Sequence, residues 1–287
     1  MKTYLNCIPC FVQQTLTACR FVTDDESVHE SVLRDVLAML KDIDMHQTPP
    51  AMAMRVYRLI RQRTGREDPY QDVKDQTTRE VLRLLPDLRR QVRQAADPFT
   101  MAVRFAIGGN TIDCGVGHEI TLATVGKAFE HALDGPLDGD VGEFQAATRA
   151  ARSILYVADN AGEIVADRLL IEQLPAGRVT LAVRGRAVLN DATRADAEAA
   201  GYDDRIEIID NGSDAPGTVL QECSDAFRRR FAEADLIIAK GQGNFETLSD
   251  AEGNIFFLFK VKCPVISHHT GCPMGHLLVR KNAAAPR

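Results

Sequence analysis

The chain has 287 residues, of which 45% are hydrophobic and 26% charged, as in a globular protein with one large domain or two smaller ones. Its formal net charge of −6 argues against a general nucleic-acid-binding surface, and no run reaches the roughly 18 apolar residues of a membrane span. The N-terminal stretch lacks the apolar run of a secretory signal, so we expect a cytoplasmic protein whose seven cysteines are reduced.

Residues 1–100 are expected to form a helical N-terminal subdomain. Three segments carry apolar side chains at helical spacing: 31–43, 51–65 and 77–97. Because proline lacks the amide hydrogen that a helix needs, we expect Pro86 to interrupt the last of these helices and Pro98 to follow its end. Two places are expected to be loops: Pro49 with Pro50, and residues 65–70.

Residues 101–287 are expected to form an α/β domain. Four short apolar, β-branched runs are predicted strands: 153–159, 178–185, 205–210 and 234–241. Helical segments are predicted between them at about 163–174, 192–200 and 217–232. One more buried strand is predicted within 254–266. Such alternation is typical of a parallel sheet covered on both faces, so we expect a Rossmann-like three-layer α/β/α domain after the helical subdomain.

Polar residues gather where the predicted strands end. The first of these junctions holds Asp159, Asn160, Gly162 and Glu163. The others contain Asn110 with Asp113, Asn190 with Asp191, residues 210–218, and Lys240, Gly241, Gly243 and Asn244. Each junction alone could be a turn or a helix cap. Together they lie where open parallel sheets bind ligands, at the carboxyl ends of strands.

The residue types at these junctions predict a metal centre. Asp159, Asn160 and Asp191 offer only oxygen ligands, which suit Mg²⁺ or Mn²⁺ and also accept Co²⁺ or Ni²⁺. Two carboxylates would neutralise a divalent ion, which could still attract a phosphate and activate water. Lys240 and the backbone of a 241–243 loop would stabilise charge on phosphoryl oxygens. These features predict metal-dependent hydrolysis of a phosphate ester, with catalytic roles for Asp159, Asp191 and Lys240.

The neighbouring residues have less specific patterns. Gly241, Gly243 and Asn244 are expected to contact the substrate. Gly162 is expected to let the backbone approach the ion without a Cβ atom in the way. Glu163 either orients a metal ligand or complements the dipole of the following helix, and we favour the helix dipole.

Several short motifs resemble one known family, the damage-control phosphatases, long catalogued as domain of unknown function 89. In chain order they are "CIPC", "GNTID", "ADNAGEIVADRLLIEQL", "LNDAT", "GSDAPGT", "KGQGNFETL" and "KVKCPV", from about residue 4 to 266. The Cys7-x-x-Cys10 pair resembles the stand-alone, mostly prokaryotic subgroup. The resemblance implies a helical portion on a Rossmann-like domain, and divalent-metal phosphatase activity on small, damaged or surplus phosphometabolites.

The resemblance also implies roles for single residues. It assigns metal ligation to Asp159, Asn160 and Asp191, and it places Lys240 near the phosphate. The remaining match, the "GNTID" segment with Asn110 and Asp113, is expected beside the pocket.

Some alternatives stay open. A non-hydrolytic Rossmann-like protein could bind a nucleotide or methyl donor through Asp159, although no G-x-G-x-x-G follows the first strand. Cys7 and Cys10 are either small core residues or a redox or metal pair. They could form a zinc site with the tail residues His268, His269, Cys272 and His276. The sequence specifies neither the substrate, nor the native metal, nor the oligomeric state.

Overall fold

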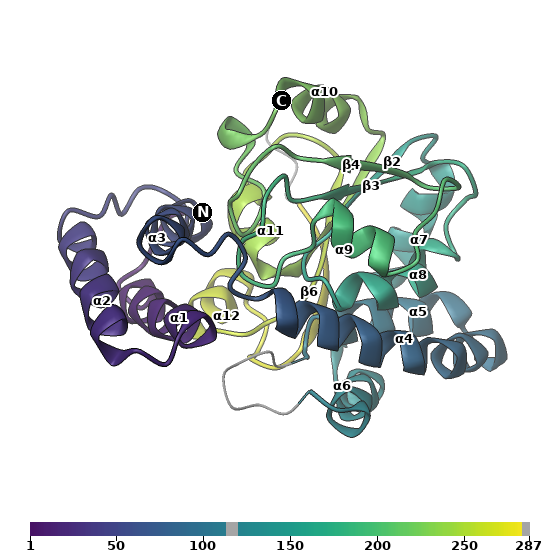
Figure 1. Cartoon of the computed structure of the whole chain (residues 1–287). Helices are drawn as coiled ribbons and strands as arrows, with labels where there is room; N and C mark the ends of the chain where they lie inside the picture. The colour runs from purple at the N-terminus through teal and green to yellow at the C-terminus, as the bar shows by residue number, and fades with distance from the viewer. Residues whose placement is uncertain (113–119, 283–287) are drawn as a thin grey trace.

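A seven-stranded sheet runs through the computed structural model, which describes residues 1–112 and 120–282 (Figure 1). The strands, in chain order, are β1 (Leu137–Asp138), β2 (Ile154–Val157), β3 (Val179–Val183), β4 (Glu207–Asp210), β5 (Leu236–Lys240), β6 (Ile255–Lys260) and β7 (Leu277–Lys281). Their order across the sheet is β1-β7-β6-β5-β2-β3-β4, with β2 to β6 parallel and β7 antiparallel to β6. The predicted α/β fold with a mainly parallel sheet is confirmed. Strands β1 and β7 were not predicted.

Two groups of helices cover the sheet. One face shares its core with α4 (Gln71–Gln94), α5 (Pro98–Gly109), α6 (Leu122–Asp134), α7 (Val141–Ala150), α8 (Glu163–Ile171) and α9 (Arg194–Ala199). The other face packs against α10 (Asp225–Glu233), α11 (Gly241–Leu248) and α12 (Pro264–Thr270). Because side chains alternate along a strand, Tyr156 of β2 lies in the first core and Val157 in the second. The three layers are therefore α4–α9, the sheet, and α10–α12.

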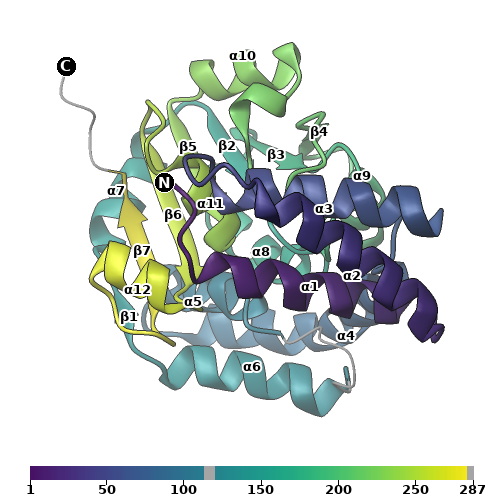
Figure 2. The same cartoon turned by 90° about the vertical axis from the view of Figure 1, so that its left-hand side faces the viewer.

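The first three helices build a core of their own. They are α1 (Cys7–Val22), α2 (Glu26–Lys41) and α3 (Pro49–Thr64), and Figures 1 and 2 show them gathered on one side of the α/β part. Phe11, Val36 and Ile60 are buried among them, together with Val188 from the β3–α9 loop. The Arg61 guanidinium also donates to the carbonyl of Ala187 at 2.9 Å. Helices α1–α3 therefore sit on the loops that follow the parallel strands.

Two predictions about prolines were wrong, for reasons of helix geometry. Pro49 and Pro50 begin α3 instead of lying in a loop, because the first N–H groups of a helix need no helical partner. Helix α4 continues through Pro86, which lies on its exposed side, where water can satisfy the carbonyl that loses a partner. The buried side chains of Leu85 and Leu88 hold this part of the helix to the core.

Three boundaries after the strands also differ from prediction. Helix α10 begins at Asp225 and not near Thr218, because the residues after β4 form turns in which side chains bind the backbone. In those turns Asn211 Oδ1 accepts from the amides of Gly185 and Ser213. The predicted 241–243 loop is the first turn of α11. The strand predicted within 254–266 ends at Lys260, and α12 follows it.

None of the described helices combines the length and the apolar character that crossing a membrane requires.

Candidate functional site

The winding of the sheet reverses direction beside β2. The chain proceeds from β2 to β3 and β4 on one side and then returns to β5 and β6 on the other. In open parallel sheets, ligands bind outside the carboxyl ends of strands at such a reversal. Asp159 and Asn160 follow β2, and Gly241 follows β5, so these residues stand at the reversal. A Cβ atom on Gly241 would lie only 1.9 Å from Asp159 Oδ2, and its φ of +80° favours glycine.

Backbone hydrogen bonds hold the predicted metal ligands side by side. Asn160 and Asp191 form an isolated antiparallel bridge. The amide of Ala192 donates to the carbonyl of Asp159 at 2.7 Å, and the amide of Ala161 donates to that of Asn190 at 2.9 Å. The structure therefore brings Asp159, Asn160 and Asp191 together from the ends of two neighbouring strands.

Glu163 lies at the centre of a buried network behind these residues. Its side chain is fully buried, and Oε2 accepts from Asn110 Nδ2 at 2.7 Å and from Asn160 Nδ2 at 2.8 Å. The same two amides donate to Asp159 Oδ2, at 2.7 and 2.9 Å. Glu163, in the first turn of α8, thus holds the side chain of Asn160 in place as well as lying where it can complement the helix dipole.

Lys240 lies beneath the network. Its Nζ atom is fully buried and lies 2.7 Å from Glu163 Oε1 and 2.5 Å from Asp167 Oδ1, and it donates to the carbonyl of Ala106 at 2.9 Å. Burial lowers the pKa of Lys240, but the carboxylates of Asp167 and Glu163 outweigh it and raise the pKa overall. The ammonium is therefore charged and faces carboxylates of the protein.

Arg184 is a second buried cation of the site, and the sequence analysis missed it. Its side chain is 1% exposed, Nε donates to Asp191 Oδ2 at 2.6 Å, and Nη2 lies 3.6 Å from Asp159 Oδ1. Arg184 directly follows the strand at 179–183. The same pattern, a basic residue at the end of an apolar strand, had led to the prediction for Lys240, so it could have identified Arg184 as well.

A cavity of about 420 Å³ opens over the carboxylates. Helices α1 and α3 form one wall. The loops after β2, β3, β4 and β6 form the other, together with the N-terminal parts of α11 and α12. Its polar and ionisable lining includes Cys7, Cys10, Gln14, Asp159, Asn160, Asn190, Asp191, Gln242, Glu246, Lys262 and Cys263. A volume of this size is typical of sites for small molecules.

A larger hollow, of about 550 Å³, lies beside the start of β3 and the end of α8. Two of its basic residues are engaged by the protein: Arg89 pairs with Glu172 at 2.6 Å, and Arg168 donates to the carbonyl of Ala200 at 2.8 Å. We therefore take the cavity over the carboxylates as the functional site.

Comparison with known proteins decides the family. A model of the damage-control phosphatase ARMT1-like domain matches residues 3–278. Damage-control phosphatases of Archaeoglobus fulgidus and Pyrococcus horikoshii are 31% and 30% identical to the chain, each over 98% of it and 99% of their own length. A crystal structure of the Pyrococcus horikoshii protein, described as a DUF89 family protein, covers 99% of this chain and 100% of its own with a TM-score of 0.86 and 29% identity.

The chain belongs to the damage-control phosphatase family. An uncharacterized protein of Methanocaldococcus jannaschii is also similar, with 32% identity over 98% of this chain and 96% of that protein. The family consists of metal-dependent phosphatases, so the chain is an enzyme of this class. The alternative of a non-hydrolytic nucleotide- or methyl-donor-binding protein is thereby set aside.

The electrostatics of the candidate site fit a divalent cation. Burial, and after it the nearby carboxylates of Asp191 and Glu163, raise the pKa of Asp159 to about 8. Burial also raises the pKa of Asp191, while Arg184 acts in the opposite direction. The buried carboxylates thus repel one another, and a bound cation would relieve this repulsion. Among the described residues, the buried Asn110 Oδ1 also has no hydrogen-bond partner.

Several residues predicted to contact substrate lie outside the cavity wall of the phosphatase. Lys240, Gly241 and Asn244 are not among the residues that line it. Asn244 is fully buried, and its Nδ2 donates to the carbonyls of Ala158 and Lys240 at 3.1 and 2.6 Å. It therefore joins the ends of β2 and β5. Gly243 lines the cavity, whereas Asp113 lies outside the described residues.

Packing gives a reason for glycine at position 162 in addition to the expected approach of an ion. A Cβ atom there would lie 2.2 Å from Thr77 Cγ2 of α4.

Proposed function

We propose that this phosphatase hydrolyses phosphate monoesters of small metabolites, including damaged or surplus ones, in the cavity over Asp159 and Asp191. One observation carries the proposal: the buried carboxylate of Asp191, the partly buried carboxylate of Asp159 and an amide meet at the reversal of the sheet, under a cavity of about 420 Å³. The damage-control names of the Archaeoglobus and Pyrococcus relatives support this substrate class. The thiols of Cys7, Cys10 and Cys263 in the cavity wall suit the reducing cytoplasm.

Asp159, Asn160 and Asp191 would hold a divalent ion: Mn²⁺, Co²⁺, Ni²⁺ or Mg²⁺. When bound, such an ion supplies Lewis acidity toward a phosphoryl oxygen and lowers the pKa of bound water. The two amide hydrogens of Asn160 are used by Asp159 and Glu163, which leaves its carbonyl oxygen available as a ligand.

The positively charged and N–H groups of the cavity wall would bind the phosphoryl group. Helix α11 begins at Gly241, so its first amides have no helical partner and can donate to phosphoryl oxygens. Lys262 lines the cavity and lies close enough to Asp159 to lower the pKa of that carboxyl. We assign to Lys262 the phosphate contact that the sequence analysis assigned to Lys240. Lys240 would act as a positioning residue through Glu163.

Two chemical routes fit this arrangement. In one, an Asp159 oxygen attacks phosphorus, the alcohol leaves, and water then hydrolyses the phospho-aspartate. In the other, Asp159 and Asp191 both act as ligands and water attacks phosphorus directly. Acid quenching during turnover separates the routes, because only the first route leaves a phosphoryl group covalently bound to Asp159.

The proposal is tested by phosphate release from p-nitrophenyl phosphate and a panel of phosphometabolites, with each of the four metals and with EDTA. We expect metal-dependent turnover, and we expect Asp159→Asn to lower kcat/KM by about 10³-fold or more, as loss of a central electrostatic group does. The matched control is Asp87→Asn, because Asp87 is exposed and pairs only with the neighbouring Arg90 in the contacts described. Wild-type protein that turns over no phosphoester with any metal would refute the proposal.

A further inference from the structure

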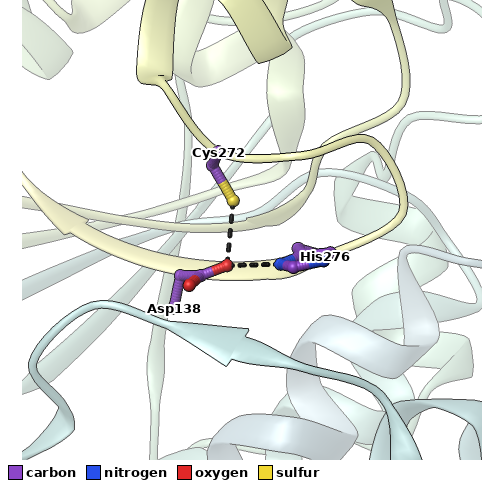
Figure 3. Close-up of side chains that lie close together, drawn as sticks. All are labelled: Asp138, Cys272 and His276. Carbon is purple, nitrogen blue, oxygen red and sulfur yellow. Dashed lines mark hydrogen bonds and ion pairs between the residues drawn. The ribbon is translucent and has the colours of Figure 1, made fainter.

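Three side chains with different metal-binding atoms meet at the far edge of the sheet (Figure 3). Asp138 ends β1, Cys272 follows α12, and His276 precedes β7. Asp138 Oδ2 lies 3.1 Å from Cys272 Sγ and 2.6 Å from His276 Nδ1, and Figure 3 shows both side chains directed at this one carboxylate. The three ligand atoms all lie within 4.8 Å of one another.

This cluster differs from the zinc site considered for the C-terminal tail. Cys272 and His276 do meet, but their partner is Asp138 and not the Cys7 and Cys10 pair, which lines the phosphatase cavity. His269 instead packs its ring against Phe245, with 5.8 Å between ring centroids. Among the described residues, Asp138, Cys272 and His276 are the group of at least three histidine, cysteine, Asp or Glu side chains whose ligand atoms lie this close together.

The backbone around the cluster is held independently of these side chains. The amide of Gly275 donates to the carbonyl of Val261 at 2.8 Å, and the amide of Leu277 donates to that of Pro136 at 3.0 Å. Arg280 donates to the carbonyl at the end of α12 at 2.9 Å. The backbone that carries the three metal-binding side chains is therefore held in place without an ion. Cys272 is buried, but the Asp138 and His276 side chains are 46% and 29% exposed, so an ion can enter from solvent.

The arrangement is unsuited to a nucleophilic cysteine. A nucleophilic thiol needs a base or a positive charge beside the sulfur, whereas here the thiol donates to a carboxylate and the imidazole contacts that same carboxylate.

We propose that Asp138, Cys272 and His276 form a zinc site, separate from the phosphatase centre, with water in the fourth position. One thiolate, one imidazole and one carboxylate suit a borderline-soft ion such as Zn²⁺, whereas the phosphatase centre offers oxygen alone. The thiolate and the carboxylate together neutralise the ion. Binding releases the thiol proton to solvent and leaves the imidazole neutral, so the charges balance.

The zinc site would brace one wall of the cavity. The loop that carries Cys272 and His276 forms two backbone hydrogen bonds with Val261. One is the bond from the amide of Gly275, and in the other the amide of Val261 donates to the carbonyl of His276 at 3.0 Å. The next residues along the chain, Lys262 and Cys263, line the cavity. Only this effect on the cavity wall rests on the proposed function. The zinc site itself is inferred from the positions of the Asp138, Cys272 and His276 side chains.

The test is cobalt substitution of the full-length chain. Co²⁺ bound by a thiolate gives a strong charge-transfer absorption in the near ultraviolet, which an all-oxygen site does not give. We expect two Co²⁺ per wild-type chain and one such band. Cys272→Ser and His276→Gln each lose one equivalent of cobalt, and Cys272→Ser loses the band completely. Asp159→Asn loses the other equivalent and the phosphatase activity but keeps the band, so failure of the proposed function is seen separately.

The other thiols near the surface supply the controls. Cys263→Ser and the double variant Cys7→Ser/Cys10→Ser should keep the band, since these residues lie at the cavity. A band that disappears in either of these variants, or persists in Cys272→Ser, overturns the proposal, as does wild-type protein that shows no band. His276→Gln retains every cysteine. If it shows the circular dichroism spectrum of the wild type while losing cobalt, ligand loss and not misfolding is the cause.

Discussion

The phosphatase centre and the Asp138 cluster both place a carboxylate at the end of a strand, but they differ in what compensates its charge. In the centre, Arg184 and Lys240 are buried beneath the carboxylates, and some negative charge is left over for a cation. At the Asp138 cluster, the charge of the carboxylate is compensated by hydrogen bonds from the Cys272 thiol and the His276 imidazole. The first arrangement offers only oxygen atoms, which suit a hard cation, whereas the second must release a thiol proton before a softer ion can bind.

Replacing the deepest cation should have the largest effect on the centre. In Lys240→Met, Glu163 and Asp167 lose their buried partner, and an uncompensated buried charge of this kind costs about 3–5 kcal/mol. We expect the free energy of unfolding, measured with urea, to fall by that amount. The matched control is Lys281→Met, whose ion pair with Glu143 is about half exposed and should contribute about 1 kcal/mol or less. Equal losses in the two variants would contradict a special role for the buried pair.

Replacing the upper cation should act on catalysis. Arg184 holds the Asp191 carboxylate in place, and loss of such an outer partner of a metal ligand typically costs about 10–100-fold. We expect Arg184→Gln to lower kcat/KM by this factor at saturating Mn²⁺. The control is Arg186→Gln, two residues along the same loop, whose exposed guanidinium pairs with Glu67. If both variants retained wild-type kcat/KM, Arg184 would be only a packing residue.

The sequence predicts the ends of the strands better than it predicts the contacts between them. Buried parallel strands are continuous apolar runs, so the positions of Asp159 and Asp191 could be inferred from one chain. The side chains that complete the centre could not, because they depend on β2 lying between β3 and β5. That neighbourhood turns Lys240 toward Glu163 and brings Arg184 to Asp191.

The edge of the sheet was missed for a different reason. Strand β1 has only two residues, Leu137–Asp138, and so has no periodicity to detect. Asp138 acquires its neighbours only because β1 pairs with β7, which starts directly after His276. The proline errors in the helices are local, since a helix tolerates proline in its first turn or on an exposed face when its other side chains are well packed.

Glu246 shows what burial does to a carboxylate in the cavity wall that has neither Arg184 nor Lys240 beside it. Burial raises its pKa from 4.5 to about 7, against weaker opposing effects of Gln242 and the N-terminal ammonium. Because the folded protein binds this proton more tightly than the unfolded chain, the stabilisation is complete below pH 4.5 and is lost as the pH rises to about 7. The loss should be on the order of 2 kcal/mol, given 1.36 kcal/mol per pKa unit and partial solvent exposure.

Urea unfolding of wild type and Glu246→Gln at pH 4.5 and 7.5 measures this loss, with the exposed Glu252→Gln as control. At pH 4.5 the free energy of unfolding of Glu246→Gln should be lower than that of wild type, and at pH 7.5 it should approach or exceed the wild-type value. A difference between the two proteins that is the same at both pH values would show that Glu246 has the same pKa in the folded and unfolded states.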